Sequence, residues 1–236
     1  MKKPKYQRIL LKLSGEALAS GQDGILNFDF IKEVATQIKR CLNAGVQVAV
    51  IVGAGNIWRG RQGTGMDQCR ADHMGMLATV VNSLALEDVF IREGMKARVM
   101  TSVEMKAFAD TYTARDAIRA LEAGEVVIFG GGLGLPFFST DTAAALRAAE
   151  IGADCILFSK NIDAIYSADP KKDPNAVRYT DLTYAEILDK NLRALDLSAS
   201  TICMDNNINS YAFGLADPEN IWRVVMGESV GTAIHN

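Results

Sequence analysis

The feature that most constrains this chain is a repeated alternation of short apolar stretches with longer segments of helical spacing. The stretch Gln47–Val52 (QVAVIV) is almost continuously apolar, as expected of a strand covered on both faces of a sheet. Between Ile31 and Leu42, apolar residues recur at i, i+3, i+4 and i+7. Strands separated by helices of this length form βαβ units. The pattern therefore predicts an α/β fold with a mostly parallel central sheet.

The same alternation extends over most of the chain. The predicted helices cover about 31–42, 74–89, 113–123 and 141–151, and a capping box of Thr183 and Glu186 opens another. The predicted strands are Arg8–Leu13, Gln47–Val52, Ala97–Met100, Glu125–Phe129, Asp154–Phe158, Asn209–Phe213 and Gly231–Ile234.

Length and composition limit the class of protein. The chain has 236 residues, of which 49% are hydrophobic and 22% charged, so a disordered chain is excluded. We expect a single domain with two lobes, about 1–153 and 154–236. The longest apolar stretches are only strand-length, which predicts no membrane span. The basic N-terminus is not followed by an apolar region of signal-peptide length, so we expect a cytoplasmic protein.

Charge and residue usage narrow the chemistry. The net charge of −3 argues against nucleic acid as a main partner, because phosphate neutralisation needs a basic face. The four cysteines are widely spaced and are expected to be free and mostly buried. With His73 and His235 the only histidines, a zinc site and a histidine-based catalytic triad are both disfavoured.

Glycine-rich segments follow three of the predicted strands. They begin at Ser14-Gly15, at Gly53-Ala54-Gly55 and at Gly130. The carboxyl ends of parallel strands share one edge of a sheet, where ligands bind, and glycines let backbone amides approach phosphate oxygens. A single such loop is explained by tight turns alone. Three on one edge, two of them carrying a cation, indicate a phosphate-rich ligand.

Three charged side chains accompany these loops. Lys12 ends the first strand, and Arg59 lies in the second loop. Both suit phosphoryl transfer, which needs cations to offset charge on the transferred group. Lys12 and Arg59 could equally be ordinary charged side chains that reach solvent and bind no ligand, and this alternative stays open. Asp141 opens a predicted helix, where it would orient Lys12, hold magnesium or act as a plain N-cap.

Several motifs give the sequence a specific resemblance. It resembles the bacterial UMP kinases of the amino acid kinase family along nearly its whole length. DHMGMLAT and PFFSTD distinguish that group within the family. The matching segments are KLSGEAL (12–18), GAGNIWRG (53–60), ADHMGMLATVVN (71–82), GLPFFSTDTAAALRAAEI (134–151), DAIYSADPKKDP (163–174), LTYAEIL (182–188) and RVVMGESVGT (223–232).

The resemblance implies a three-layer αβα sandwich and transfer of the ATP γ-phosphate to UMP, with Mg²⁺ accompanying ATP, as a step of pyrimidine nucleotide biosynthesis. Lys12, Arg59 and Asp141 would be catalytic, Lys12 and Arg59 by stabilising the transition state and Asp141 by orienting Lys12. The family implies a homohexamer, with GTP as activator and UTP as inhibitor. The residues implied to bind ATP are Lys12, Leu13, Ser14, Gly15, Gly55, Arg59, Asn161, Tyr166 and Asp169.

A second set of residues is implied to bind UMP. Asp72 would bind the ribose hydroxyls, and the loop before the helix of Asp141 would wrap the phosphate and uracil. The set is Ala54, Asp72, Leu133, Gly134, Leu135, Pro136, Phe137, Phe138, Ser139 and Thr140.

The chain departs from the family pattern at Ala54, where a glycine is usual, and at Leu133 and Leu135, where the family has a TGNP-like run. Two alternatives follow from these departures. One is a kinase of the same fold with another acceptor, and the other is a non-catalytic nucleotide-binding regulator.

Overall fold

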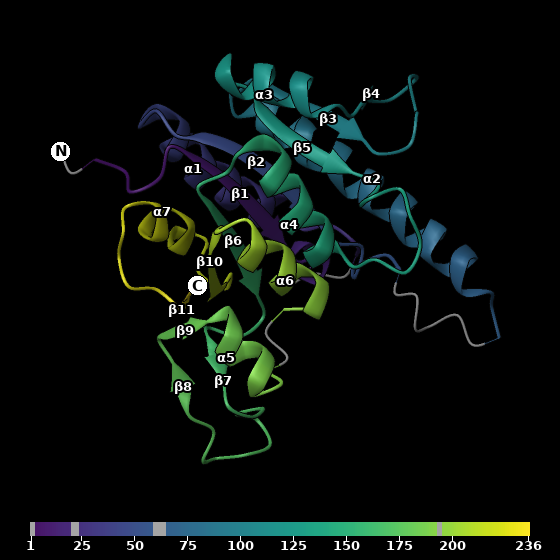
Figure 1. The fold of residues 1–236 in the computed structure, drawn as a ribbon. Coiled ribbons are helices and arrows are strands. Elements are labelled where there is room, and N and C mark those ends of the chain that lie inside the picture. The colour runs from purple at the N-terminus through teal and green to yellow at the C-terminus, as the bar shows by residue number, and fades with distance from the viewer. Residues whose placement is uncertain (1–2, 20–23, 59–64, 193–194) are drawn as a thin grey trace.

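The central element of the molecule is a nine-stranded sheet (Figure 1). The structure is a computed structural model that describes residues 3–19, 24–58, 65–192 and 195–236. The strand order is β4-β3-β5-β2-β1-β6-β10-β11-β9, and every neighbouring pair runs parallel except β10 and β11. The strands are β1 Arg8–Leu13, β2 Gln47–Val52, β3 Ala97–Thr101, β4 Asp110–Thr111, β5 Val126–Gly130, β6 Cys155–Lys160, β9 Asp181–Thr183, β10 Asn209–Gly214 and β11 Thr232–His235.

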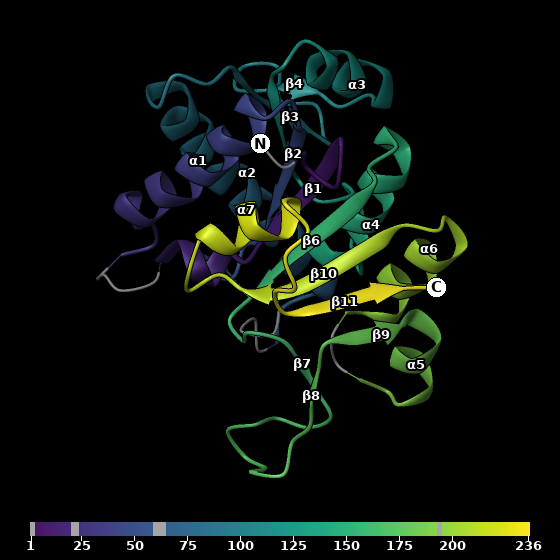
Figure 2. The same ribbon diagram turned by 90° about the vertical axis from the view of Figure 1, so that its left-hand side faces the viewer.

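Helices cover both faces of this sheet, giving the three layers of an αβα sandwich (Figures 1 and 2). One face packs against α1, α2 and α7, and the other against α3, α4, α5 and α6. The bounds are α1 Phe28–Asn43, α2 Gln68–Arg92, α3 Ala114–Glu122, α4 Thr140–Ile151, α5 Tyr184–Asp189, α6 Leu197–Asp205 and α7 Glu219–Val225. The predicted α/β class, with a mostly parallel sheet, is confirmed.

The alternation of side chains along each strand explains the two cores. In β1, Leu11 and Leu13 face the α1 and α2 layer, while Leu10 faces the α4 layer. All three are fully buried. This two-sided burial is the reason that the central strands are continuously apolar in the sequence.

Most predicted elements form close to their expected bounds. Strands Arg8–Leu13 and Gln47–Val52 form over the residues predicted, and the capping box of Thr183 and Glu186 opens α5. Helix α2 begins at Gln68, earlier than the first apolar residue of its pattern, because the Asp67 side chain caps it. The four cysteines are free, three of them buried, as expected.

A small hairpin of β7 (Ile165–Tyr166) and β8 (Arg178–Tyr179) projects from the sandwich beside α5 (Figure 2). The charged turn between Ala168 and Asn175 lies at its tip. Two-residue strands are too short to show an alternating pattern, so no strand is predicted here from the sequence.

Helix α2 is long and unusually apolar. Its length and mean hydropathy of 1.5 over 18 residues would suffice to cross a membrane. Its inner residues Leu86, Val89 and Phe90 pack into the core against the sheet. This packing makes α2 a core helix of the sandwich, which accounts for its composition.

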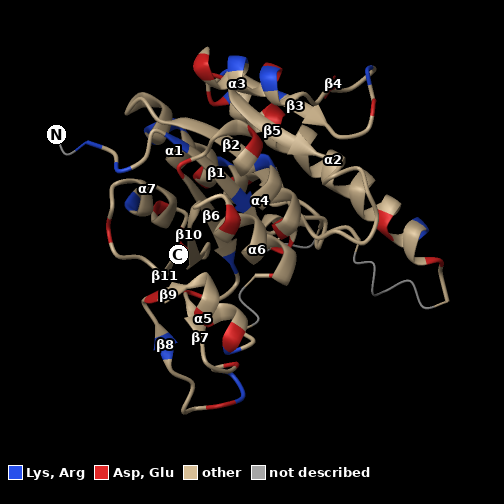
Figure 3. Ribbon diagram, viewed as in Figure 1, with Lys and Arg blue, Asp and Glu red and all other residues tan. Residues whose placement is uncertain are grey.

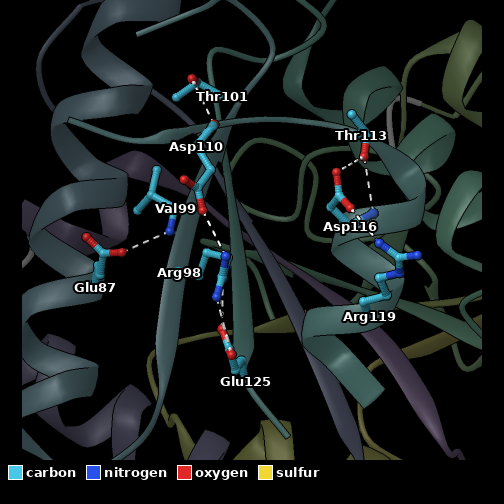
Figure 4. A network of polar contacts seen from close by, with 9 residues as sticks. All are labelled: Glu87, Arg98, Val99, Thr101, Asp110, Thr113, Asp116, Arg119 and Glu125. Carbon is cyan, nitrogen blue, oxygen red and sulfur yellow. Dashed lines mark hydrogen bonds and ion pairs between the residues drawn. The ribbon is translucent and has the colours of Figure 1, made fainter. Parts of the chain in front are cut away.

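Ion pairs secure the edge of the sheet at β3 and β4 (Figure 4). Arg98 lies between Asp110 at 3.0 Å and Glu125 at 2.8 Å. Strand β4 pairs with β3 only at Met100 and Thr101, and the backbone N–H of Val99 donates instead to Glu87 of α2. Burial raises the pKa of Glu87. These contacts hold the short edge strand on the sheet.

Charged residues of both signs are mixed over the helices and loops (Figure 3). No large basic face is seen among the described residues in this view (Figure 3). Anion binding must therefore depend on a few basic side chains gathered at one place, such as Lys12 at the carboxyl end of β1.

Candidate active site

The order in which strands are added to the sheet reverses at β1, which lies between β2 and β6. From β2 the chain continues to β3 and β5 on one side, and from β6 to β10 on the other. Such a switch point, at the carboxyl ends of the strands, is where open α/β sheets bind ligands. The glycine-rich segments after β1, β2 and β5 all meet there, as the sequence predicts.

Two lysines and one aspartate form the charged centre of this edge. Lys12 Nζ lies 2.9 Å from one oxygen of Asp141, and Lys160 Nζ lies 2.9 Å from the other. Lys12 ends β1, Lys160 ends the neighbouring β6, and Asp141 stands in the first turn of α4. All three side chains are mostly buried, with that of Asp141 only 15% exposed.

Burial and charge set the protonation states of this cluster. Burial alone would raise the pKa of Asp141, but the ammonium groups of Lys12 and Lys160 outweigh it and lower the pKa to about 2. Burial lowers the pKa of Lys160, opposed by Asp141 and reinforced by Lys12. The Asp141 carboxylate is thus ionised near neutral pH and holds two cations side by side.

The amino end of α4 adds further donors. Ser139 caps the helix by accepting hydrogen bonds from the N–H groups of Asp141 and Thr142. The Ser139 hydroxyl also donates to Asp196, which caps α6 and contacts Thr142 at 3.0 Å. A helix amino terminus carries positive potential and favours anions.

The first two glycine-rich segments pack closely against each other. A Cβ atom added to Gly15 would lie 2.4 Å from the carbonyl oxygen of Gly53 and 2.7 Å from the nitrogen of Gly55, so only glycine fits. Beneath them, the buried Asn82 of α2 exchanges hydrogen bonds with Asn56 and also donates to the Gly53 carbonyl at 2.8 Å. The loop after β2 is therefore held rigidly from below.

A cavity of about 420 Å³ opens beside these segments. Seven of the residues predicted for the acceptor line it, together with Gly55. Asp72 is one of them, and it also accepts the backbone N–H of Phe137 at 2.8 Å. The full lining is Glu16, Ala54, Gly55, Trp58, Ala71, Asp72, Gly75, Met76, Thr79, Gly132, Leu133, Leu135, Phe138, Ser139 and Thr140.

A second cavity, of about 540 Å³, lies at the β7–β8 hairpin. Tyr166 and Asp169, both predicted to flank adenine and ribose, line it. None of the three charged residues lines either cavity, but two of them adjoin lining residues in the chain: Thr140 of the first cavity precedes Asp141, and Ile162 of the second follows Lys160 by two residues.

Some predicted residues stand elsewhere. The side chain of Asn161 donates to Glu16 at 2.8 Å and does not line the second cavity, and Gly134, Pro136 and Phe137 do not line the first. Leu13 is buried in the core, and Ser14 precedes the 3-10 turn Gly15–Ala19. Arg59 lies outside the described residues. Their proposed roles stay predictions.

Sequence reasoning missed Lys160 as a partner of Asp141, and Thr79 and Met76 as lining residues. Asp72, Met76 and Thr79 recur along α2 at i, i+4 and i+7, so a helical projection from Asp72 would have found the last two. Lys160 had no such signal, because its place depends on the pairing of β6 with β1.

Comparisons with known proteins identify the family of the chain. The sequence profile of the amino acid kinase family matches residues 7–213. The structure is similar to UMP kinase from Bacillus anthracis, with a TM-score of 0.94 and 36% identity over 98% of this chain and 96% of that one. UMP kinase from Ureaplasma parvum gives 0.92 and 35%, with both chains fully covered. Uridylate kinase from Archaeoglobus fulgidus gives 0.74 and 29% over 96% and 99%. The resemblance read from the sequence is confirmed, and the chain belongs to the amino acid kinase family.

Proposed function

We propose that this chain is a kinase that transfers the γ-phosphate of ATP to UMP and forms UDP and ADP. The observation that carries the proposal is the pair of buried lysines held on Asp141, next in sequence to residues that line the two cavities. The similarity to UMP kinases over the whole chain identifies the acceptor. A place in pyrimidine nucleotide biosynthesis follows from the product.

The reaction needs charge stabilisation more than acid–base chemistry. A phosphate oxygen of UMP forms the new bond to the γ-phosphorus, while the bond from that phosphorus to the β,γ-bridging oxygen breaks and its electrons remain on ADP. The attacking oxygen is already anionic, so no strong base is required. Lys12 and Lys160 offset the charge on the transferred group, Asp141 fixes the Lys12 and Lys160 ammonium groups in place, and Arg59 would assist from the loop after β2.

The two cavities divide between the proposed lobes. Every residue that lines the first cavity precedes 153, and every residue that lines the second follows 154. We assign the first to UMP, with its phosphate toward Ser139 and Thr140 at the amino end of α4, and the second to the adenosine of ATP, with Tyr166 and Asp169. This division supports an N-terminal UMP lobe and a C-terminal ATP lobe.

The donor set does not favour a magnesium cage made by the protein itself. Both oxygens of Asp141 face ammonium groups, and the described residues include no group of three or more Asp, Glu, His or Cys side chains suited to a metal. Mg²⁺ commonly binds through nucleotide phosphates and water. We therefore assign Mg²⁺ to ATP and attribute no step to a protein-bound ion.

Self-association is proposed on the exposed face of α2. Met74, Leu77 and Val81 are 39%, 54% and 47% exposed and lie on one stripe of that helix. A second copy of the chain is the natural cover for this stripe in a homohexamer. The hexamer itself, activation by GTP, inhibition by UTP and a cytoplasmic location rest on the family resemblance.

An acceptor panel tests the proposal. Purified protein is given saturating Mg-ATP with UMP, CMP, AMP or dTMP, each with and without GTP or UTP, and ADP formation is followed. We expect UMP to be much the best acceptor. A better rate with another acceptor would support a different kinase of this fold, and binding of UMP and ATP without turnover would support a regulator.

A further inference from the structure

The segment Gly131–Gly134 forms a tight turn at the wall of the first cavity, where Gly132 and Leu133 line it. Three of its residues, Gly131, Gly132 and Gly134, have φ values of 79°, 58° and 73°, which favour glycine. The N–H of Gly134 donates to the carbonyl of Gly131 at 2.9 Å. A turn of glycines has few side-chain contacts of its own, so its shape depends on outside anchors.

Two hydroxyl groups supply such anchors. Thr79 of α2 accepts the N–H of Gly131 at 2.9 Å. Ser102, which follows β3, donates its hydroxyl to the carbonyl of Gly132 at 2.5 Å, and its backbone N–H donates to Gly130. Ser102 therefore fixes the direction of the peptide group that directly precedes Leu133.

Ser102 is in turn held by a buried guanidinium. Arg147 of α4 is 6% exposed, and its Nη2 donates to the Ser102 hydroxyl at 3.1 Å. Its Nη1 pairs with Glu150 at 2.5 Å, and its Cζ atom lies 3.8 Å from the ring centre of Tyr112. Tyr112 donates to the same Glu150 carboxylate at 2.6 Å. The guanidinium is thus fixed in position and orientation.

A buried charge of this kind is costly for stability alone, since an apolar side chain of similar size would fill the same space. Among the described residues, Nε of Arg147 finds no hydrogen-bond acceptor, so the site is not arranged to satisfy the guanidinium fully. What the charge does provide is an oriented donor that polarises the Ser102 hydroxyl toward Gly132.

We propose that Arg147 and Ser102 are positioning residues that hold the Gly131–Gly134 turn in the shape that receives the acceptor nucleotide. The proposal rests on the assignment of the first cavity to UMP. Arg147 acts through Ser102, and Ser102 acts through the carbonyl of Gly132. Neither residue lines the cavity, so both set affinity for the acceptor without touching it.

The test is a steady-state comparison of Ser102→Ala with the unmodified chain. Loss of one hydroxyl bond is expected to raise KM for UMP about three- to tenfold. KM for ATP and kcat should stay within about twofold. Calorimetric titration with UMP alone should show the same weakening. Ser210→Ala is the matched control, because it removes a buried hydroxyl bond to Tyr184 at β10, which four strands separate from β3 in the sheet, and should leave KM for UMP unchanged.

Arg147→Lys keeps the charge and loses the planar fork. If Arg147 acts through Ser102, the double variant that combines Ser102→Ala with Arg147→Lys should raise KM for UMP no further than Ser102→Ala alone. An unchanged KM for UMP in Ser102→Ala, or equal losses for UMP and ATP, would overturn the proposal even if Arg147→Lys fails to fold. A wild-type chain without UMP-dependent turnover would instead refute the proposed function, so the two failures are distinguishable.

Discussion

At the scale of single residues, the site depends on one carboxylate that holds two ammonium groups. Asp141 keeps Lys12 and Lys160 close together although both are largely buried and repel each other. An ammonium group has three donors, so each lysine can pair with Asp141 and still donate to a phosphate oxygen. In the proposed reaction, this arrangement would stabilise a transferred phosphoryl group without a general base.

Lys12→Ala tests the role of the first cation. We expect turnover to fall by about two to three orders of magnitude, because a preorganised positive charge at the transferred group is lost. The fold should persist, since the Lys12 backbone keeps its pairing in β1. The measurement is ADP formation beside circular dichroism. A near-normal rate would show that Lys12 is not the cation of the transition state.

Asp141→Asn tests the carboxylate. The pKa of Asp141 is lowered from 3.8 to about 2, so its stabilising effect is present above pH 4 and is lost as the pH falls through 2. At pH 7 the variant should be about 3 kcal/mol less stable, because two buried cations lose their counter-ion. Turnover should fall as well.

Urea unfolding at pH 7 and pH 3 measures this dependence. The difference in unfolding free energy between wild type and Asp141→Asn should shrink by about 1 kcal/mol at the lower pH. A difference that is the same at both pH values would show that the carboxylate is not held ionised by the lysines.

At the scale of elements, the site forms where the carboxyl ends of neighbouring strands and the amino end of a helix lie close together. Strands β1 and β6 place Lys12 and Lys160 side by side, and the amino end of α4 supplies Asp141. Helix α2 supports two loops at once, because Thr79 anchors Gly131 and Asn82 anchors Gly53. The loops are therefore fixed before any nucleotide binds.

Gly15→Ala tests the packing of the loops after β1 and β2. The new Cβ atom would collide with backbone atoms of Gly53 and Gly55, so we expect a loss of about 2 kcal/mol of stability and a weaker affinity for ATP. Gly75→Ala is the matched control for stability, because its Cβ would meet only a Trp58 carbon at 3.8 Å. Thermal unfolding of both variants gives the comparison. Equal stability of the two would contradict the close packing at Gly15.

The sequence predicts elements well where packing imposes a period. Strands β1 and β2 are buried on both faces, so their apolar runs mark their bounds. Helix α7 has seven residues and no side-chain cap, and β7 and β8 have two residues each. Segments this short carry too few residues to show a period.

The site residues that could be predicted from the sequence are likewise those that belong to recognisable elements. Lys12 and Asp141 were predictable because each stands at the end of a recognisable element. Their contact with Lys160 was not, because it depends on the pairing of β1 with a strand about 145 residues later in the chain. The hydroxyl of Ser102 and the guanidinium of Arg147 likewise meet only through the tertiary fold.

At the scale of the whole molecule, the exposed stripe of α2 lies on the helix whose inner face lines the first cavity. Self-association on this stripe would bury apolar surface and place the UMP cavities of two copies near their shared interface. Assembly and acceptor binding would then depend on the same helix.

Leu77→Glu tests this surface. A buried charge at the interface should dissociate the assembly into smaller species, observed by sedimentation velocity. Val177→Glu is the matched control, because Val177 is 58% exposed and directly precedes β8, a strand that lies away from α2 (Figure 1). If Leu77→Glu leaves the mass of the assembly unchanged, the stripe is not the contact between copies.

The most direct test of the account follows the transferred group itself. ATP labelled at the γ-phosphorus is mixed with UMP and the protein for a single turnover, and the products are separated. We predict that the label appears in the β-phosphate of UDP and that Lys12→Ala suppresses this transfer. Label that stays in ATP, or that is released as inorganic phosphate with UMP unchanged, would contradict the account.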